Sequence, residues 1–302
     1  MDFTLTSDQT ALTDAIDRIA QQFDAKPTDF HGFALSGAAL EHQLTEGEYF
    51  DIALIPEFGP LTAALAVERL ARSAFAAEAA LSMLVRPQLP GEWPRPVAVV
   101  ESGRPGRFVA TAKTLIVIDG ERISLARPSP GDVEAVESLY AYPMGRLVGS
   151  PALTKLSAAD AANVRKWMRV ALAAEAAGLI QAAIDSTVEH LSIRKQFGRP
   201  LGTFQALRHR MAECAVLAGG VRLLARKAAF SGNDGDAALA ALHAQDSGTR
   251  MAYEMHQMLG AMGMTLEHPL HLWTYRIKAL LSELGGRGGQ AQAVATHCFG
   301  KP

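Results

Sequence analysis

The sequence has little of what marks several classes of protein. Among its 302 residues there are two cysteines, Cys214 and Cys298, too few for a disulfide framework or a cysteine-based metal site. The net charge is only −2, so no basic excess indicates a nucleic-acid partner. No apolar run reaches the roughly 20 residues of a membrane span, and the N-terminus lacks the basic and apolar regions of a secretion signal. We therefore expect a cytoplasmic protein, with no nucleic acid and no membrane among its partners.

The composition that is present is that of an ordinary globular protein. Hydrophobic residues make up 49% of the chain and charged residues 20%, and 302 residues leave room for two or three domains. Four prolines between residues 86 and 96 mark a boundary. We expect a helical domain over 1–85, a β domain over 86–150 and a helical bundle domain over 151–302.

The first part is predicted to be helical. Thr6 and Gln9 form a capping box, ahead of an apolar helix that the Lys-Pro pair at 26–27 would end. Apolar spacing predicts a further helix over 37–45 and one long Ala/Leu helix over 61–83.

The middle part is predicted to form strands that end near Val148. Short runs rich in branched and aromatic residues favour β structure, and Asp119-Gly120 predicts a hairpin turn between the last two runs. The expected strands cover 97–100, 107–110, 114–118 and 122–125.

From Ala158 onward the chain is predicted to be helical. Apolar residues recur about every 3.6 residues from 164 to 183, and helical patterns resume over 203–224 and 237–258. Long helices joined by short polar turns favour a four-helix bundle. We therefore expect a mainly α protein with a small β domain.

Breaks between these helices follow glycine and proline. Gly198 and Pro200 end the first helix, and the polar run 231–236 separates the next two. The glycines of 285–289 predict a flexible stretch.

A basic, glycine-containing turn separates the first two of these helices. Residues 194–200 are Arg-Lys-Gln-Phe-Gly-Arg-Pro. Guanidinium and backbone N–H groups at such a turn can hold an anion. Charge alone favours an ordinary solvated loop instead, because exposed charges are the rule.

Two longer strings carry a family resemblance. Residues 192–209, SIRKQFGRPLGTFQALRH, closely resemble the signature of the acyl-CoA dehydrogenase family in its C-terminal helical domain. Residues 255–268, MHQMLGAMGMTLEH, resemble the family's second glycine-bearing segment, at the expected distance. The resemblance implies an acyl-CoA dehydrogenase-like fold that is mainly α, with a reduced middle β domain and a C-terminal four-helix bundle. It also implies FAD-dependent oxidation of the Cα–Cβ bond of an acyl-CoA thioester.

The resemblance also implies which residues touch the cofactor. In the family's homo-oligomers the matching positions serve the pyrophosphate and adenosine half of the flavin of a neighbouring subunit. Arg194 offers a fork for phosphate oxygens, Phe197 an aromatic wall and Gly260 a close approach of the backbone. A core position for Phe197 and a helix-bridging one for Gln257 are the alternatives, and Ala261 stands where the family has a second glycine. The mapped residues are Arg194, Gln196, Phe197, Gln205, Gln257 and Gly260.

The family's catalytic glutamate occupies one of two positions, and neither holds a carboxylate in this chain. By resemblance these positions fall on Gly285 and Met168. Glu283 lies two residues from the first, and in a helix that shift turns a side chain by about 200°, so we expect it to face away. Glu175, on the same apolar stripe as Met168, is predicted to be a buried, hydrogen-bonded structural carboxylate. No catalytic residue is assigned to this chain.

The predicted β domain also lacks what the family uses to hold the flavin ring. Neither a Thr/Ser-rich stretch nor a Trp-Ile-Thr-Asn-like strand occurs over 97–148. His256, His268 and His271 lack the carboxylate or cysteine partners of a metal site, so no metal is expected. The chain thus keeps one half of a flavin site.

Chains of this kind resemble the reduced small subunits of heteromeric α2β2 acyl-CoA dehydrogenases of bacterial steroid catabolism. The resemblance implies a full-length acyl-CoA dehydrogenase subunit as the partner that supplies the base, an acyl-CoA substrate that is steroid-derived, and an electron-transfer flavoprotein or similar acceptor. Two alternatives stay open. One is a non-catalytic homologue that stabilises a partner or binds a ligand, and the other is a self-sufficient flavoenzyme with an unusual base.

Overall fold

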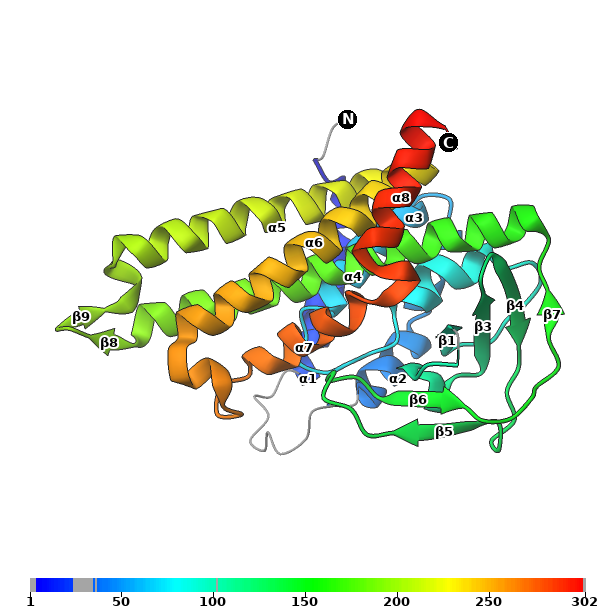
Figure 1. Ribbon diagram of the computed structural model, residues 1–302, viewed down its shortest axis with the longest axis horizontal. Helices are drawn as coiled ribbons and strands as arrows, with labels where there is room; N and C mark the ends of the chain where they lie inside the picture. The colour runs from blue at the N-terminus through cyan, green and yellow to red at the C-terminus, as the bar shows by residue number, and fades with distance from the viewer. Residues whose placement is uncertain (1–3, 24–34, 36, 102, 301–302) are drawn as a thin grey trace.

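The computed structural model describes residues 4–23, 35, 37–101 and 103–300. Long helices run along the molecule, and a small β region lies at one end of them (Figure 1). The N-terminal part packs against the longest helix, α4 (Ala158–Ile193), mainly through its helix at Gly59–Leu70. The expected fold class, mainly α with a small β region, is confirmed.

The N-terminal helices are α1 (Ser7–Phe23), α2 (Ala38–Glu46) and α3 (Gly59–Leu70), with a 3₁₀ helix at Tyr49–Leu54. The capping box is confirmed, because the Thr6 N–H donates to Gln9 Oε1 at 3.1 Å and the Gln9 N–H donates to Thr6 Oγ1 at 3.2 Å. The helix expected over 37–45 is confirmed as α2. The predicted helix end at 26–27 lies outside the described residues.

The single helix expected over 61–83 is wrong. α3 ends early, and after an irregular stretch a π-helical turn follows at Leu81–Val85. A distant side chain donates a hydrogen bond to a carbonyl group of this irregular stretch. Arg276 donates to the Ser73 carbonyl at 2.6 Å. A carbonyl that already accepts from a distant donor does not need the helical bond that the sequence spacing predicted.

The β region forms two small sheets. One has the strand order β1-β3-β4-β7 and the other β2-β6-β5, with β1 and β3 parallel and the other neighbours antiparallel. Three of the expected strands are confirmed as β1, β3 and β4, and the hairpin sets Asp119 opposite Arg122. The bounds are β1 (Val97–Glu101), β2 (Gly106–Arg107), β3 (Thr114–Asp119), β4 (Arg122–Ala126), β5 (Val133–Val136), β6 (Met144–Leu147) and β7 (Thr154–Lys155).

The strand expected over 107–110 is wrong beyond Arg107. Phe108 takes a left-handed backbone with φ 61°, and a 3₁₀ turn follows at Val109–Thr111. The Phe108 N–H donates to the Pro143 carbonyl at 2.7 Å. The chain therefore leaves the sheet directly after Arg107, and this turn fixes the direction of the Arg107 side chain.

The C-terminal part is a helical bundle around α4, which contacts α3, α5, α6 and α7. α4 has the length and apolar composition of a membrane span, but 89% of its most apolar stretch is buried, so it is the core of the bundle. Asn233 caps α6 by accepting the Gly235 N–H at 2.8 Å, which confirms the break over 231–236. The other bounds are α5 (Gln205–Ser231), α6 (Asp234–Leu259), α7 (Leu270–Leu280) and α8 (Gly286–Phe299).

The flexible stretch expected over 285–289 is wrong, because α8 begins there. Gly285 (φ 83°) and Gly286 (φ 61°) adopt left-handed backbone, which turns the chain into the helix. The buried Gln290 donates to the Leu284 carbonyl at 2.9 Å. The two glycines thus allow a tight turn, which a hydrogen bond from Gln290 stabilises.

Close packing between α3 and α4 gives a test of this fold. At Gly178 on α4 an added Cβ would lie 2.1 Å from the Glu68 carbonyl oxygen. We expect Gly178→Ala to lower the free energy of unfolding by about 1–3 kcal/mol, because the two backbones must separate. The matched control is Gly219→Ala on α5, where nothing lies within 4 Å. It should raise the free energy of unfolding by about 0.5–1 kcal/mol. Denaturant unfolding measures both, and two effects of the same sign would contradict this packing.

Candidate functional site

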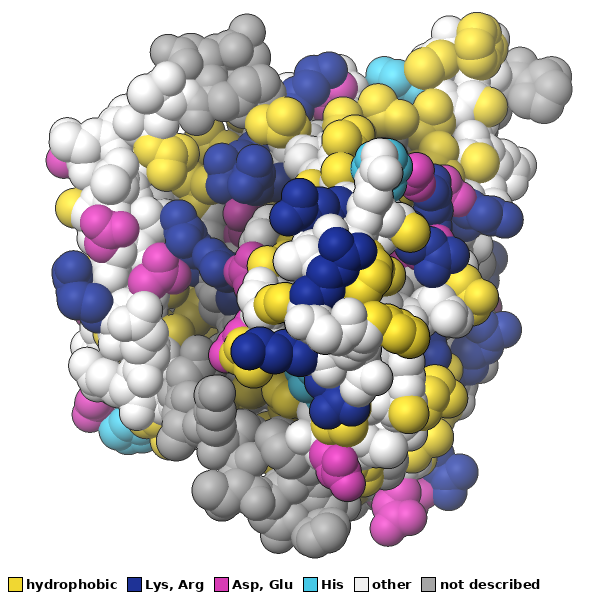
Figure 2. Space-filling model, turned by 90° about the vertical axis from the view of Figure 1, so that its left-hand side faces the viewer, with side chains coloured by type: hydrophobic (Ala, Val, Ile, Leu, Met, Phe, Trp, Pro, Cys, Tyr) yellow, Lys and Arg dark blue, Asp and Glu magenta, His cyan; other side chains and the backbone are white. Residues whose placement is uncertain are grey.

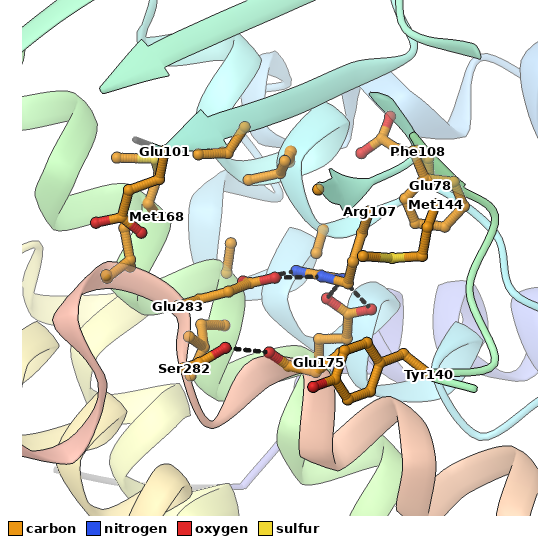
Figure 3. A pocket seen from close by; sticks show the side chains of 18 of the residues that line it. Glu78, Glu101, Arg107, Phe108, Tyr140, Met144, Met168, Glu175, Ser282 and Glu283 are labelled. Carbon is orange, nitrogen blue, oxygen red and sulfur yellow. Dashed lines mark hydrogen bonds and ion pairs between the residues drawn. The ribbon is translucent and has the colours of Figure 1, made fainter. Parts of the chain in front are cut away.

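A cavity of about 110 Å³ lies where the N-terminal segment, the β region and the bundle meet (Figure 3). Its walls come from residues 77–81, from β1 and β2, from α4 and from the turn at 282–284. Met168, one of the two positions at which the resemblance sets a catalytic base, lines it. So does Leu284, the neighbour of the other position, Gly285. The two positions at which the resemblance sets a base therefore lie at or beside this cavity.

The Arg107 side chain extends from β2 into this cavity. Its Nη1 lies 2.9 Å and 2.8 Å from the two carboxylate oxygens of Glu175 on α4. Its Nε and Nη2 lie 2.6 Å and 3.0 Å from the two oxygens of Glu283. Figure 3 marks these contacts with dashed lines. One planar guanidinium thus bridges two carboxylates that are far apart in the sequence.

Tyr142 completes the cluster. Its hydroxyl donates to Glu175 Oε1 at 2.6 Å, and Arg107 Cζ lies 4.7 Å from the centre of its ring. Burial, together with Glu175, raises the pKa of Tyr142 well above its usual value, so the phenol stays a donor. Burial lowers the pKa of Arg107, but Glu175 and Glu283 outweigh burial and raise the pKa well above its usual value. The guanidinium therefore stays charged, and both carboxylates are its counter-ions.

Of the expectations for the two glutamates, one is confirmed and the other is wrong. Glu175 is confirmed as a buried, hydrogen-bonded carboxylate, with a side chain 7% exposed. The expectation that Glu283 faces away is wrong, because its carboxylate pairs with Arg107 in the cavity. α7 ends at Leu280 and Glu283 lies in a short 3₁₀ turn, so the rotation of a regular helix does not apply. A carboxylate held in such a pair is a poor general base, because protonation would break the pair.

Arg107 and Tyr142 are not predicted from the sequence as members of a site. They lie 68 and 33 residues from their shared partner Glu175, and no spacing rule joins residues so far apart. The available signal was a lone arginine within the otherwise apolar strand expected over 107–110. An arginine in such a run is rarely buried unless it is paired.

Glu78 also lines the cavity, and its carboxylate is bonded to the backbone. It accepts the Ser82 N–H at 3.0 Å and the Val97 N–H at 3.1 Å, and the Ser82 hydroxyl donates to it as well. Burial raises the pKa of Glu78 in spite of these donors. The carboxylate thereby links the π-helical turn to β1, which is a structural role.

The cavity is too small for a flavin ring. Ligand sites in proteins usually measure about 300–1,000 Å³, against about 110 Å³ here. The Arg107 guanidinium takes up the space between the two carboxylates. The residues of this junction therefore do not fit the isoalloxazine of FAD.

The residues expected to contact FAD lie at the opposite end of the bundle from the β region (Figure 1). Arg194 follows α4, Gln196 belongs to the two-stranded hairpin of β8 (Lys195–Gln196) and β9 (Arg199–Pro200), and Phe197 lies at its turn. Gln205 begins α5, Gln257 lies in the last turn of α6, and Gly260 follows that helix. All six are exposed, Phe197 by 88%, so the alternative of a core position for Phe197 is wrong.

This end of the molecule is basic. The stretch 190–212 contains five Lys or Arg residues and no Asp or Glu. Figure 2 views this end, and Lys and Arg side chains gather across it. The Arg199 guanidinium lies over the Phe204 ring, 4.2 Å from its centre. A positive surface with an exposed aromatic side chain suits phosphate groups and a stacked base.

Arg194 also lines a second cavity, of about 1000 Å³, between α1 and the end of α4. The rings of His190 and His268 lie 5.4 Å apart there. Burial and the neighbouring His190 lower the pKa of His268 to about 4, so this ring is neutral near pH 7. The other five expected residues do not line this cavity. The chain by itself therefore does not gather the six into one pocket.

The three histidines singled out from the sequence serve local hydrogen bonds. His256 Nε2 lies 2.8 Å from Thr274 Oγ1, and His271 Nδ1 lies 3.0 Å from the His268 carbonyl. In the part of the chain that the structure describes, no three His, Cys, Asp or Glu side chains are grouped to hold a metal ion.

The helical bundle matches a known protein family in sequence, and the whole chain matches solved structures in fold. Residues 160–296 match the family model described as acyl-CoA dehydrogenase, C-terminal domain. The chain is 31% identical over 207 residues to acyl-CoA dehydrogenase FadE34 of Mycobacterium tuberculosis, a match that covers 64% of this chain and 29% of that protein. The chain spans about a third of the length of the curated relatives it matches.

Solved structures share the fold over its full length. The ChsE4-ChsE5 complex from Mycobacterium tuberculosis matches with a TM-score of 0.75 and 21% identity, over 100% of both chains. The Tcur3481-Tcur3483 steroid ACAD matches with a TM-score of 0.76 and 19% identity, over 97% of this chain and 98% of that one. At such identities the likeness concerns the fold alone.

Glu78 gives a test of the electrostatics around the first cavity. Its pKa in the folded chain is raised above the usual 4.5, so its contribution to stability is complete below pH 4.5 and is lost as pH rises through the folded-state value. We expect the free energy of unfolding of the wild type, minus that of Glu78→Gln, to be larger at about pH 5 than at about pH 8. The exposed Glu57→Gln is the control and should show no such trend. Denaturant unfolding at the two pH values measures these free energies. A wild-type advantage over Glu78→Gln that grows with pH would contradict the raised pKa.

Proposed function

We propose that this chain, whose residues 160–296 match the C-terminal domain of the acyl-CoA dehydrogenase family, is a subunit of an FAD-dependent enzyme that desaturates a CoA thioester between Cα and Cβ. In this proposal a full-length acyl-CoA dehydrogenase subunit supplies the catalytic base and the flavin-ring side of the site. This chain supplies the side that holds the pyrophosphate and adenosine. FAD, when bound, accepts the hydride from Cβ.

The small cavity at the domain junction, with its paired carboxylates, is the observation that carries the proposal. Both carboxylates near the family's base positions, Glu175 and Glu283, are paired with Arg107. A base needs a free carboxylate within reach of the proton it removes. Neither carboxylate is free, and the cavity has no room for a flavin ring. A second chain must then bring both the base and the ring side.

The exposed end of the bundle has residues suited to binding the pyrophosphate and adenosine half of FAD. Arg194 would bind pyrophosphate oxygens through its guanidinium, and Phe197 would pack against the adenosine. Gly260 has φ 59° and open space where a Cβ would stand, so the backbone there can approach a nucleotide closely. Gln196, Gln205 and Gln257 add polar contacts at the same surface.

The proposed assembly is an α2β2 heterotetramer with two FAD, each between unlike chains. The fold likeness to the ChsE4-ChsE5 complex and to the Tcur3481-Tcur3483 steroid ACAD supports a heteromer and a steroid-derived acyl-CoA substrate. An electron-transfer flavoprotein or similar carrier in the cytoplasm is the proposed acceptor.

A non-catalytic homologue is the second candidate, because the same small cavity and paired carboxylates would suit a chain that only stabilises a partner. The two differ in whether this chain's own residues hold flavin. The self-sufficient flavoenzyme finds no support in a cavity of about 110 Å³.

Loss of the Arg194 guanidinium separates these candidates. Arg194→Ala in the complex purified with its partner should weaken FAD binding roughly 10- to 150-fold, because a charge-assisted hydrogen bond contributes about 1.5–3 kcal/mol. Flavin fluorescence during dilution or dialysis measures the affinity. The neighbouring Lys195→Ala removes the same charge from an exposed position outside the six and should change the affinity less than threefold or so. An unchanged affinity in Arg194→Ala would favour the non-catalytic candidate.

A further inference from the structure

We propose that Arg107 is an internal ligand: a guanidinium, attached to β2, that fills a cation site at the domain junction and keeps it closed. The site itself is formed by Glu175, Glu283 and Tyr142. Without the Arg107 side chain it would take a free guanidinium or amidinium ion. These contacts lie inside one chain, so they can be tested without a partner, flavin or substrate.

The chemistry of the site matches a planar cation with donors on two edges. Both oxygens of Glu175 accept from Nη1 of the guanidinium, and those of Glu283 accept from Nε and Nη2 along one edge. The Tyr142 hydroxyl donates to Glu175 at 2.6 Å, which leaves the other carboxylate lone pairs directed at the cation. An ammonium ion has no such fork and cannot pair with both carboxylates in this way.

Backbone strain at the cluster indicates that its geometry is imposed by its surroundings. Phe108, Ala141 and Leu284 have φ of 61°, 56° and 55°, in the left-handed region that non-glycine residues rarely adopt. Each is the direct neighbour of a member of the cluster, namely Arg107, Tyr142 or Glu283. Strained residues persist where the structure around them over-determines their conformation, and they gather at ligand-binding sites.

The surroundings exclude water from the cation. The Arg107 side chain is 9% exposed and that of Glu175 is 7% exposed, while Glu283 at 33% forms the side nearest solvent. The adjoining cavity of about 110 Å³ has apolar walls that include Met144, Met168 and Leu172. Removal of the Arg107 side chain would join its volume to this cavity and leave the buried Glu175 and the partly buried Glu283 without a cation. A small planar cation would fit both the space and the charge.

The test uses the full chain with Arg107→Ala and methylguanidinium chloride at millimolar concentrations. We expect the variant to unfold about 5–15 °C below the wild type, because a buried pair loses one partner. Its midpoint should then rise with the logarithm of the methylguanidinium concentration, while methylammonium at the same ionic strength has no such effect. Titration calorimetry should detect one methylguanidinium per Arg107→Ala chain and none in the wild type.

Two further variants keep the test decisive. Arg226→Ala removes another bidentate arginine, which pairs with Glu68 alone, and methylguanidinium should not bind there. Arg107→Lys keeps the charge without the fork and should be less stable than the wild type. An Arg107→Ala chain as stable as the wild type, or indifferent to methylguanidinium, would overturn the proposal. If Arg107→Ala does not fold even with methylguanidinium, an Arg107→Lys chain as stable as the wild type would overturn it, and a less stable one would support it.

Discussion

A charged guanidinium buried between three parts of the chain must be neutralised there, and much of this structure depends on how that is done. Arg107 meets Glu175 of the bundle on one side and Glu283 of the turn after α7 on the other. Removing one partner of a buried pair typically costs about 3–5 kcal/mol, so the β region, α4 and the turn before α8 are held in one arrangement. The same contacts fill the position where the family resemblance sets its chemistry.

The middle and the C-terminal end of α4 consequently have different roles. Glu175 lies at the middle of the helix beside the small cavity, and Arg194 lies 19 residues further on, roughly 28 Å away at about 1.5 Å per residue. The cavity beside the middle of α4 has no room for a flavin ring. The surface at the C-terminal end is exposed and basic, with the aromatic side chain of Phe197 at its tip. A chain with this division can share a cofactor but is poorly suited to carrying out the reaction alone, which is why we propose an unlike partner.

The sequence predicted what depends on local patterns. Apolar spacing and turn residues predicted α4, α5 and α6, and short runs rich in branched residues predicted β1, β3 and β4. It did not predict the end of α3, where Arg276 bonds to Ser73 from 203 residues away. The Arg107 cluster was missed for the same reason, since its members come from β2, α4, the turn after α7 and the segment before β6. Glu283 was misjudged because a regular helix was assumed where the chain forms a 3₁₀ turn. The domain boundaries near 85 and 150 and the six flavin-contact residues stay predictions.

Flavin content tests the central claim, that this chain holds half of a shared flavin site, most directly. Absorbance of bound FAD, set against mass from light scattering, should be measured for the isolated chain and for the chain purified with a full-length acyl-CoA dehydrogenase partner. The account predicts essentially no FAD on the isolated chain and two FAD per four-chain complex. One FAD per isolated chain, or four FAD per complex, would contradict it.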